Sequence, residues 1–263
     1  MKKGEKNFIK NSKRGQLTIF IIVAILVVAI VALLFAFPKL RTSVGFEKPE
    51  SPENFIQTCL EDTIKENVEL ISLQGGSLEP SPSILYQDEK IQYLCYRNED
   101  LKPCIIQIPF LREHIEDEIK KSIEEDVNFC FDSLKQNYDD KGYSTNLKTG
   151  ETIVELLPDK IATTMNNEFT FSKADETQRR ETFRVVLNNN LYELAAIAQN
   201  ILDWETKFGG ADCNIYMDLY KYLKCNKEPL TDDTTIYILT NTDQEFKFQF
   251  ALRNNAIPPI NRI

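Results

Sequence analysis

The chain has 263 residues, of which 31 are lysine or arginine and 40 are aspartate or glutamate, so its formal net charge is −9. Its 42% hydrophobic and 27% charged residues are typical of a globular protein and exclude wholesale disorder, and its low glycine content excludes collagen-like architectures. The single histidine, His114, excludes most zinc enzymes and any Ser-His-Asp triad that does not use it. The length predicts one or two domains.

Residues 17–37 form an uncharged apolar run of 21 residues in which Thr18 carries the one hydroxyl group. As a helix, a run of this length spans about 31 Å, which matches a hydrocarbon core of about 30 Å. Pro38 follows directly, where a helix ends without losing an internal hydrogen bond. The run therefore predicts a transmembrane helix over 17–37.

The charges on either side of this run predict its orientation. Residues 1–16 carry a net charge of +5, whereas residues 38–263 carry a net charge of −14. By the positive-inside rule, 1–16 is a basic cytoplasmic leader and the bulk of the chain is extracellular. A cleaved secretory signal has an apolar core of about 7–15 residues and a small-x-small site. The longer run here, which ends in Phe35-Ala36-Phe37-Pro38, favours a retained signal anchor.

The junction between leader and apolar run carries a more specific pattern. Lys13-Arg14-Gly15-Gln16, followed directly by the apolar run, resembles the class III signal peptide of archaeal type IV pilin-like membrane-anchored surface proteins. The resemblance, confined to about the first 37 residues, implies that a prepilin-type peptidase cleaves after Gly15. Many family members carry a glutamate at the fifth mature position, which is linked to filament assembly, whereas this chain has Phe20 there. A plain signal anchor whose basic flank ends in Gly-Gln is the alternative.

Residues 38–52 alternate prolines, glycine and charges and predict a short stalk before an extracellular domain over 53–263. Ser51-Pro52-Glu53 combines a hydroxyl cap, a proline in the first turn and an acid, which predicts a helix start. Apolar residues at three- and four-residue steps continue this helix to about Leu73, and Gly75-Gly76 ends it. The stretch from Cys59 to this glycine pair also resembles uncharacterised archaeal membrane-anchored proteins, a likeness that implies no activity.

The rest of the chain mixes predicted helices and strands. Helical periodicity predicts helices over 111–138, 189–208 and 212–223. Apolar and β-branched runs predict a strand pair within 84–108, strands over 143–148, 152–157, 160–171 and 181–187, and a final hairpin of 234–240 with 245–252. Lys148-Thr149-Gly150-Glu151 predicts a hairpin turn, Asn166-Asn167 marks a bend or turn, and 258–261 is expected to be a loose tail. Without regular β-α-β alternation, this order predicts an α+β fold.

All six cysteines follow the apolar run, and an even number in an oxidising compartment predicts disulfides. The expected pairs are Cys59 with Cys130, Cys95 with Cys104, and Cys213 with Cys225. The first pair joins the apolar stripes of two helices, the second joins the arms of one hairpin, and the third flanks a short helix. No Cys-x-x-Cys spacing is present, so neither a metal nor another cofactor is predicted.

Candidate catalytic groups are few. His114 shares a helix face with Asp117 or Glu118, as in half of a carboxylate metal site, but no second histidine exists and an exposed polar face is the expected outcome. Asp203 and Glu205 flank Trp204, which is expected to pack partly buried at a helix end. No nucleophile-elbow, Walker or dinucleotide motif is present, and no catalytic residue is predicted.

These features predict a single-pass cell-surface protein of structural, pilin-like type without catalytic activity. Its expected partners are the lipid bilayer, a prepilin-type peptidase, and copies of itself or other surface proteins; the acidic outer domain disfavours nucleic acid. The alternative is a surface binding module, a receptor or adhesin, which an exposed aromatic patch of Tyr216, Tyr220 and Tyr222 would favour over simple packing of a short helix. A third hypothesis, an anchored envelope enzyme, requires convergent polar groups in a deep pocket.

Overall fold

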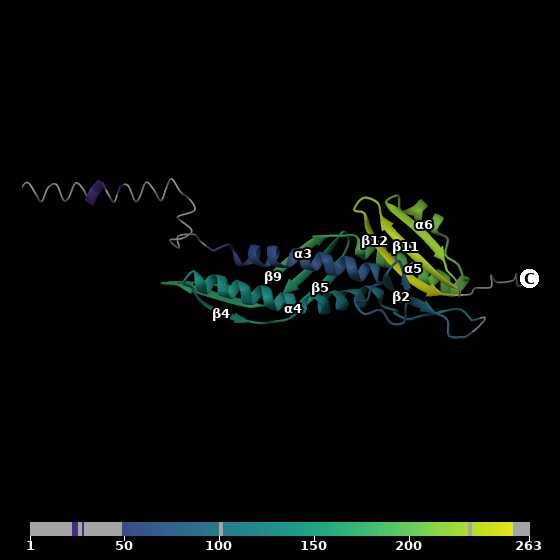
Figure 1. Ribbon diagram of the computed structural model, residues 1–263, viewed down its shortest axis with the longest axis horizontal. Coiled ribbons are helices and arrows are strands. Elements are labelled where there is room, and N and C mark those ends of the chain that lie inside the picture. The colour runs from purple at the N-terminus through teal and green to yellow at the C-terminus, as the bar shows by residue number, and fades with distance from the viewer. Residues whose placement is uncertain (1–22, 26–27, 29–48, 100–101, 231–232, 255–263) are drawn as a thin grey trace, which may run out of the picture. The chain divides into compact units, whose positions relative to one another are not determined.

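A computed structural model describes residues 23–25, 28, 49–99, 102–230 and 233–254 (Figure 1). The chain divides into two compact units, Met1–Pro49 and Glu50–Ile263. The predicted leader with its processing residues 13–16, most of the predicted span and most of the stalk lie outside the described residues, as does the predicted tail. The described residues of the span, 23–25 and 28, are helical. Among the helices that the structure describes, none is both long and apolar enough to cross a bilayer.

The second unit is built on two long antiparallel helices, α3 (Pro52–Leu73) and α4 (Leu111–Asp140). As predicted, α3 begins with a cap in which the Ser51 hydroxyl accepts a hydrogen bond from the Asn54 amide at 3.2 Å. The apolar stripes of both helices are buried: Ile56, Leu60, Ile64, Val68 and Ile71 from α3, and Ile115, Ile119, Ile123, Val127 and Leu134 from α4. Each such side chain stabilises the fold by about 1.5–3 kcal/mol.

Two three-stranded antiparallel sheets contact this helix pair (Figure 1). The first has the order β4 (Ser144–Lys148), β7 (Glu168–Lys173), β8 (Glu176–Arg180). The second has the order β5 (Thr152–Leu157), β6 (Lys160–Met165), β9 (Phe183–Asn188). The rings of Phe131 on α4 and Phe183 on β9 meet edge to face at 4.9 Å between centroids, which ties the second sheet to the helices.

The predicted hairpin turn at 148–151 is wrong, because β4 pairs with β7 and β5 pairs with β6. The predicted strand 160–171 accordingly divides at Asn166-Asn167 into two strands of different sheets. The two connections cross in close contact: the Gly150 amide donates to the Asn167 side-chain oxygen at 2.7 Å, and a Cβ on Gly150 would lie 1.9 Å from the Asn166 carbonyl oxygen. Only glycine allows this approach, so Gly150 serves a sheet crossover.

A larger sheet lies at the end of the helix pair where α3 finishes, and Figure 1 shows its C-terminal strands in yellow and its earlier strand β2 in blue. Its order is β1 (Ser83–Tyr86), β2 (Glu89–Tyr96), β12 (Phe246–Arg253), β11 (Thr234–Asn241), β10 (Leu223–Pro229), with β3 (Ile105–Ile106) also on β2. The final hairpin, β11 with β12, is as predicted. The Gln249 side chain donates to the Leu73 carbonyl at 2.7 Å and fixes this sheet to the end of α3.

Two further helices pack beside the larger sheet, α5 (Leu191–Phe208) and α6 (Cys213–Leu219). Along β11, Tyr237 and Leu239 belong to the main core with α5, whereas Ile236 and Ile238 belong to a smaller cluster on the other face. The predicted helix 212–223 ends at Leu219, and the chain then forms β10, which is a strand that the sequence analysis did not predict.

The three predicted disulfides are present, Cys59–Cys130, Cys95–Cys104 and Cys213–Cys225, and the mixed α+β class is confirmed. Their loops differ greatly in length. The first closes a separation of 71 residues, and the other two close separations of 9 and 12 residues.

Removing the disulfides one at a time, by paired cysteine-to-alanine substitution, is expected to destabilise the domain unequally. In the chain-entropy account, loss of Cys59–Cys130 costs about 4 kcal/mol and loss of either short bridge costs about 3 kcal/mol. Urea unfolding of the three double variants measures this order. Equal losses, or a larger loss from a short bridge, would contradict it.

Candidate functional site

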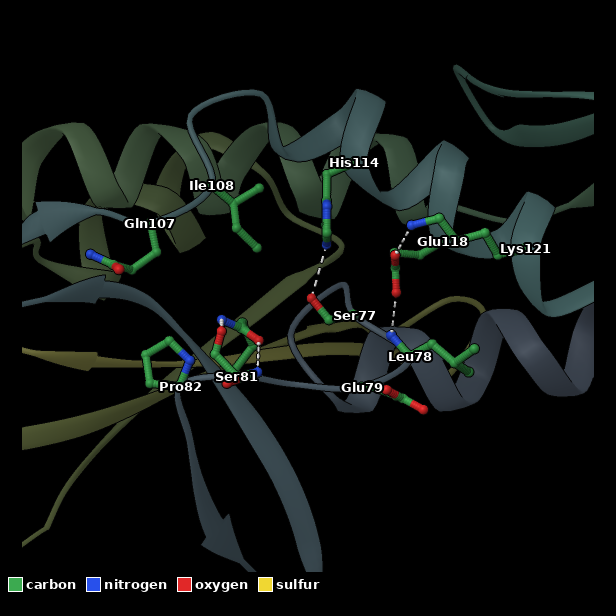
Figure 2. Close-up of a pocket in the computed structure, with 11 residues that line it drawn as sticks. Ser77, Leu78, Glu79, Ser81, Pro82, Gln107, Ile108, His114, Glu118 and Lys121 are labelled. Carbon is green, nitrogen blue, oxygen red and sulfur yellow. Dashed lines mark hydrogen bonds and ion pairs between the residues drawn. The ribbon is translucent and has the colours of Figure 1, made fainter.

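A cavity of about 520 Å³ lies between the start of α4, the loop after α3 and the larger sheet (Figure 2). Polar side chains on α4, on the loop after α3 and on β2 line it: Ser77, Ser81, Gln92, His114, Glu118 and Lys121. Gly75 and Gly76, both with positive φ, turn the chain from α3 into this loop, as the sequence analysis predicted for the helix end. A Cβ on Gly75 would lie 2.8 Å from the Cβ of Gln92, so the loop lies directly against β2.

The expectation that His114 lies on an exposed polar face is wrong. His114 is half-buried, and its Nε2 lies 2.9 Å from the hydroxyl oxygen of Ser77, itself 5% exposed. The pKa of His114 lies below its ordinary value, mainly because burial disfavours the charged ring. The ring is therefore neutral near pH 7, and its tautomer decides which of the two atoms donates.

Glu118 faces the same cavity one helical turn later, as the sequence spacing predicted (Figure 2). Its two carboxylate oxygens accept from the Leu78 amide at 2.8 Å and from the Lys121 ammonium at 2.7 Å. Burial alone would raise the pKa of Glu118, but the two hydrogen bonds and the positive charge of Lys121 together outweigh it, so the pKa lies below its ordinary value. Within the parts of the chain that the structure describes, no cluster of three histidine, cysteine or acidic side chains forms a metal site.

A serine beside a neutral histidine resembles a nucleophile with its base, but catalysis also requires an orienting group for the histidine and free oxyanion donors. Glu118, which lies one helical turn after His114, is bonded to Leu78 and Lys121. The Gln92 side chain likewise accepts from the Ser81 amide at 2.6 Å and donates to its carbonyl at 3.0 Å. These polar groups hold the 77–82 loop against α4 and β2, and we interpret the cavity as a structural feature.

Replacing His114 with glutamine is expected to flatten the pH dependence of stability between about pH 7 and 5. Because the folded-state pKa is lowered, the unfolded chain binds this proton first as the pH falls. The contribution of the neutral ring is fully present above the unfolded pKa of about 6.5 and is lost as the pH falls toward the folded value. Urea unfolding of both proteins at several pH values measures the difference, and His114 is the chain's one histidine. Parallel pH profiles for the two proteins would contradict the expectation.

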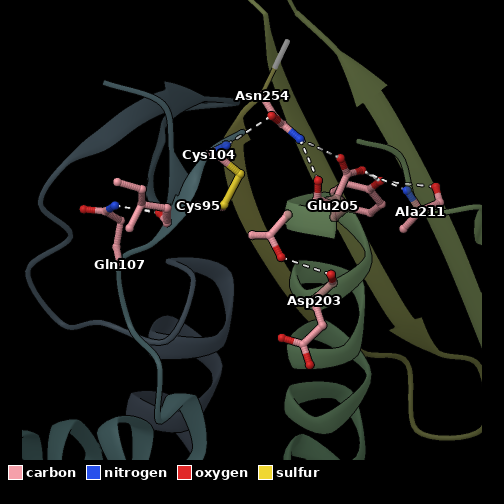
Figure 3. Close-up of a disulfide and its surroundings, with 10 residues drawn as sticks. Cys95, Cys104, Gln107, Asp203, Glu205, Ala211 and Asn254 are labelled. Carbon is pink, nitrogen blue, oxygen red and sulfur yellow. Dashed lines mark hydrogen bonds between the residues drawn. A yellow bond between two sulfur atoms is a disulfide. The ribbon is translucent and has the colours of Figure 1, made fainter. Parts of the chain in front are cut away.

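A second polar centre is the carboxylate of Glu205, which is 2% exposed near the end of α5 (Figure 3). It accepts from the Tyr237 hydroxyl, from the Ala211 amide at 3.1 Å and from the Lys227 ammonium at 3.0 Å. Burial alone would raise the pKa of Glu205, and the three donors together lower it below its ordinary value. The same burial and the nearby carboxylate raise the pKa of Tyr237, so its hydroxyl remains a donor.

Asn254, at the end of β12, connects this centre to the Cys95–Cys104 disulfide (Figure 3). Its amide nitrogen donates to the Glu205 backbone carbonyl at 3.0 Å, and its oxygen accepts from the Cys104 amide at 3.3 Å. The candidate carboxylate pair of the sequence analysis does not form a site, because Glu205 is buried in these bonds while Asp203 lies on a half-buried face. Trp204 is 45% exposed, with its ring centroid 4.7 Å from that of Phe208.

Replacing Glu205 with alanine is expected to destabilise the domain by about 2–5 kcal/mol, because the buried Tyr237 hydroxyl and the Ala211 amide lose their acceptor. Glu228, exposed on β10, provides the matched control, and its replacement by alanine is expected to change stability by no more than about 0.5 kcal/mol. Denaturant unfolding measures both. Similar small losses in the two variants would show that the Glu205 bonds contribute little.

A second cavity, of about 380 Å³, lies between α5, α6 and the chain that follows α6. Its lining is dominated by aromatic and apolar side chains: Tyr192, Ala196, Ile197, Tyr216, Leu219, Tyr220 and Tyr222, with Glu193 and Asn200 as polar groups. We call this cavity the tyrosine pocket. Its volume falls within the range of small-molecule sites, about 300–1,000 Å³.

The three tyrosines considered from the sequence, Tyr216, Tyr220 and Tyr222, all line this pocket. One of them packs against a helix, and the other two are partly exposed. Tyr216 is buried and donates to the Asn200 side-chain oxygen at 2.8 Å, which is a packing role. Tyr220 is 39% exposed and Tyr222 is half-buried. Sequence reasoning missed Tyr192, although its place four residues before Ala196 and eight before Asn200 puts all three on one face of a predicted helix.

Comparisons with protein-family models, with curated proteins and with solved structures gave no match to this chain. Three features of the molecule itself bear on its function: the N-terminal apolar run, the disulfides of the second unit and the tyrosine pocket.

Proposed function

We propose that the chain is a single-pass membrane protein whose 17–37 segment anchors an α+β domain at the cell surface, in a structural, pilin-like role without catalysis. The observation that carries the proposal is that all six cysteines, every one of which follows the uncharged run, form disulfides. Structural disulfides persist in oxidising compartments such as the cell exterior. The net charges of +5 before the run and −14 after it support the same orientation.

The way in which the chain enters the second unit supports an anchored role. The Glu50 carbonyl accepts from the Tyr138 hydroxyl at 2.9 Å, and the Glu53 carboxylate pairs with Arg180 at 2.6 Å. Burial raises the pKa of Tyr138 to about 12, so its hydroxyl stays a donor across the physiological range. The Cys59–Cys130 disulfide lies two turns further along α3. Force that reaches the domain through residue 50 would therefore meet the bonds of Tyr138 and Arg180 first, and the disulfide would hold the first turns of α3 to α4.

The proposed partners follow from this arrangement. The bilayer would hold 17–37, a prepilin-type peptidase would cleave between Gly15 and Gln16, and copies of the chain or other surface proteins would contact the displayed domain. Nucleic acid is not a proposed partner, because residues 38–263 carry a net charge of −14.

The tyrosine pocket favours a second candidate function, a surface binding module displayed by the same anchor. An exposed aromatic patch was the feature expected of such a module, and Tyr220 and Tyr222 provide partly exposed rings within a cavity of about 380 Å³. The two functions share the anchor and differ in what the outer domain contacts.

Protein isolated from its native membrane is expected to begin at Gln16, because leader cleavage after Gly15 would keep the apolar helix on the mature chain. Intact mass and N-terminal sequencing measure this directly. Replacing Gly15 with leucine is expected to abolish the cleavage, and replacing Gly4, which lies in the leader away from the junction, provides the control.

Three outcomes would contradict different parts of the proposal. A chain that begins near Met1 would remove the pilin-like processing and leave a simple signal anchor. A chain that alkaline carbonate releases from the membrane, or that reacts with a thiol reagent before reduction, would contradict the anchor or the oxidising compartment.

A further inference from the structure

The segment that carries the tyrosines of the pocket is held in place before any ligand enters. The Cys213–Cys225 disulfide closes the loop that carries Tyr216, Tyr220 and Tyr222, and the Tyr216 hydroxyl is bonded to Asn200 on α5. The Tyr222 carbonyl accepts from the Thr242 amide at 2.8 Å and from the Thr242 hydroxyl at 2.9 Å, which fixes the backbone of the loop to the strand hairpin. A backbone fixed in this way loses little entropy on binding, so this wall of the pocket is preorganised.

Two of the rings face the cavity at an angle to each other. The centroids of Tyr220 and Tyr222 lie 5.9 Å apart and their planes are inclined by 50°. Non-parallel rings of this kind contact one convex group from two sides. The electron-rich faces of such rings attract a cation that comes within about 6 Å of their centroids.

The charge beside the rings has the matching sign. Glu193 lines the pocket; one of its carboxylate oxygens accepts from the Asp159 amide at 2.9 Å, and the other is buried without a hydrogen-bond partner in the described part of the chain. Burial raises the pKa of Tyr222, with Glu193 adding to the effect, so this phenol stays neutral and keeps its ring face intact. The cation next to these tyrosines in sequence, Lys221, is highly exposed and approaches Asp218 at 3.9 Å.

These features discriminate between classes of ligand. The Glu193 carboxylate would repel an anion, and a purely apolar group would not interact with its charge. A neutral sugar could contact the rings and the hydrogen-bonding groups of the pocket, but it would leave the negative charge of Glu193 unbalanced. A cation with an apolar surface satisfies both the rings and the carboxylate, and a cavity of about 380 Å³ holds a small one.

We propose that the tyrosine pocket binds a small organic cation with a methylated ammonium head, whose methyl groups contact the rings of Tyr220 and Tyr222 and whose charge is balanced by Glu193. This inference gives the ligand class for the binding-module candidate and rests on it for its biological meaning. The binding itself depends on the second unit alone and not on cleavage or anchoring.

The test uses the full-length chain in a detergent without choline groups. Choline and its neutral isostere 3,3-dimethyl-1-butanol are titrated, and saturation transfer from protein to ligand methyl protons measures binding by NMR. Choline is expected to bind about tenfold or more tightly than the isostere, because the two share a shape and differ in charge. The chain's single tryptophan, Trp204, lies one turn after Asn200 on α5, and its fluorescence gives a second, local signal.

Single substitutions test separately what the Tyr220 ring and the Glu193 charge contribute to choline binding. Tyr220→Leu is expected to weaken choline binding about tenfold or more, whereas Tyr220→Phe, which keeps the ring face, stays within about twofold. Glu193→Gln is expected to weaken choline binding several-fold and to leave the isostere unchanged. Tyr86→Leu, on β1 outside the pocket, is the matched control and should leave choline binding unchanged.

Three results would overturn the proposal: equal binding of choline and its isostere, binding of neutral sugars without binding of choline, or no binding of any of them by a folded chain. Failure of the anchoring proposal gives a different result. A chain that begins near Met1 or leaves the membrane in carbonate, yet binds choline with these preferences, would keep the ligand assignment and remove the anchor.

Discussion

The apolar contact between α3 and α4 is the interaction on which the rest of the described structure depends. Each small sheet packs on this pair, and the larger sheet is fixed where α3 ends, through the bond from Gln249 to the Leu73 carbonyl. The amphipathic helices cannot stay folded alone, because most helical stability comes from burial of the apolar face. The Cys59–Cys130 disulfide holds the opposite end of the pair, where the first residues of the unit are attached.

Two buried acids accept hydrogen bonds from polar groups that the apolar core cannot satisfy. Glu118 satisfies a loop amide beside the end of α3, and Glu205 satisfies a hydroxyl, an amide and an ammonium where α5 meets the larger sheet. A buried carboxylate without such donors would be strongly destabilising. Both groups have a pKa below the ordinary value because their donors outweigh the burial that would raise it. The role of Glu118 in the fold shows that an acidic residue beside a cavity need not mark catalysis.

The sequence predicted features that depend on local periodicity and missed those that depend on partners distant in the chain. The α3 and α4 helices, the final hairpin and the disulfide pairs follow from helical steps, strand alternation and cysteine positions. The β8 strand, Glu-Thr-Gln-Arg-Arg, carries no apolar residue and exists because β7 pairs with it. The role of Gly150 could not be predicted without knowing that Asn166, 16 positions away in the chain, lies against it. His114 is half-buried because a loop 37 residues earlier in the chain reaches it.

The tyrosine pocket depends both on a local sequence pattern and on contacts between residues that are distant in the chain. Its three loop tyrosines stand out in the sequence, but only the tertiary structure adds Tyr192 and the unpartnered oxygen of Glu193. The disulfide that stabilises this loop lies beside β10, whose Lys227 bonds to Glu205, so the polar centre and the pocket share one support. A domain built only to be a rigid surface element has no need of a cavity with inclined aromatic rings or of a carboxylate oxygen that is buried without a hydrogen-bond partner in the described part of the chain, because both lower its stability. The inclined rings lie on a disulfide-closed loop and the carboxylate lies on α5 beside them, and this combination favours recognition as well as display.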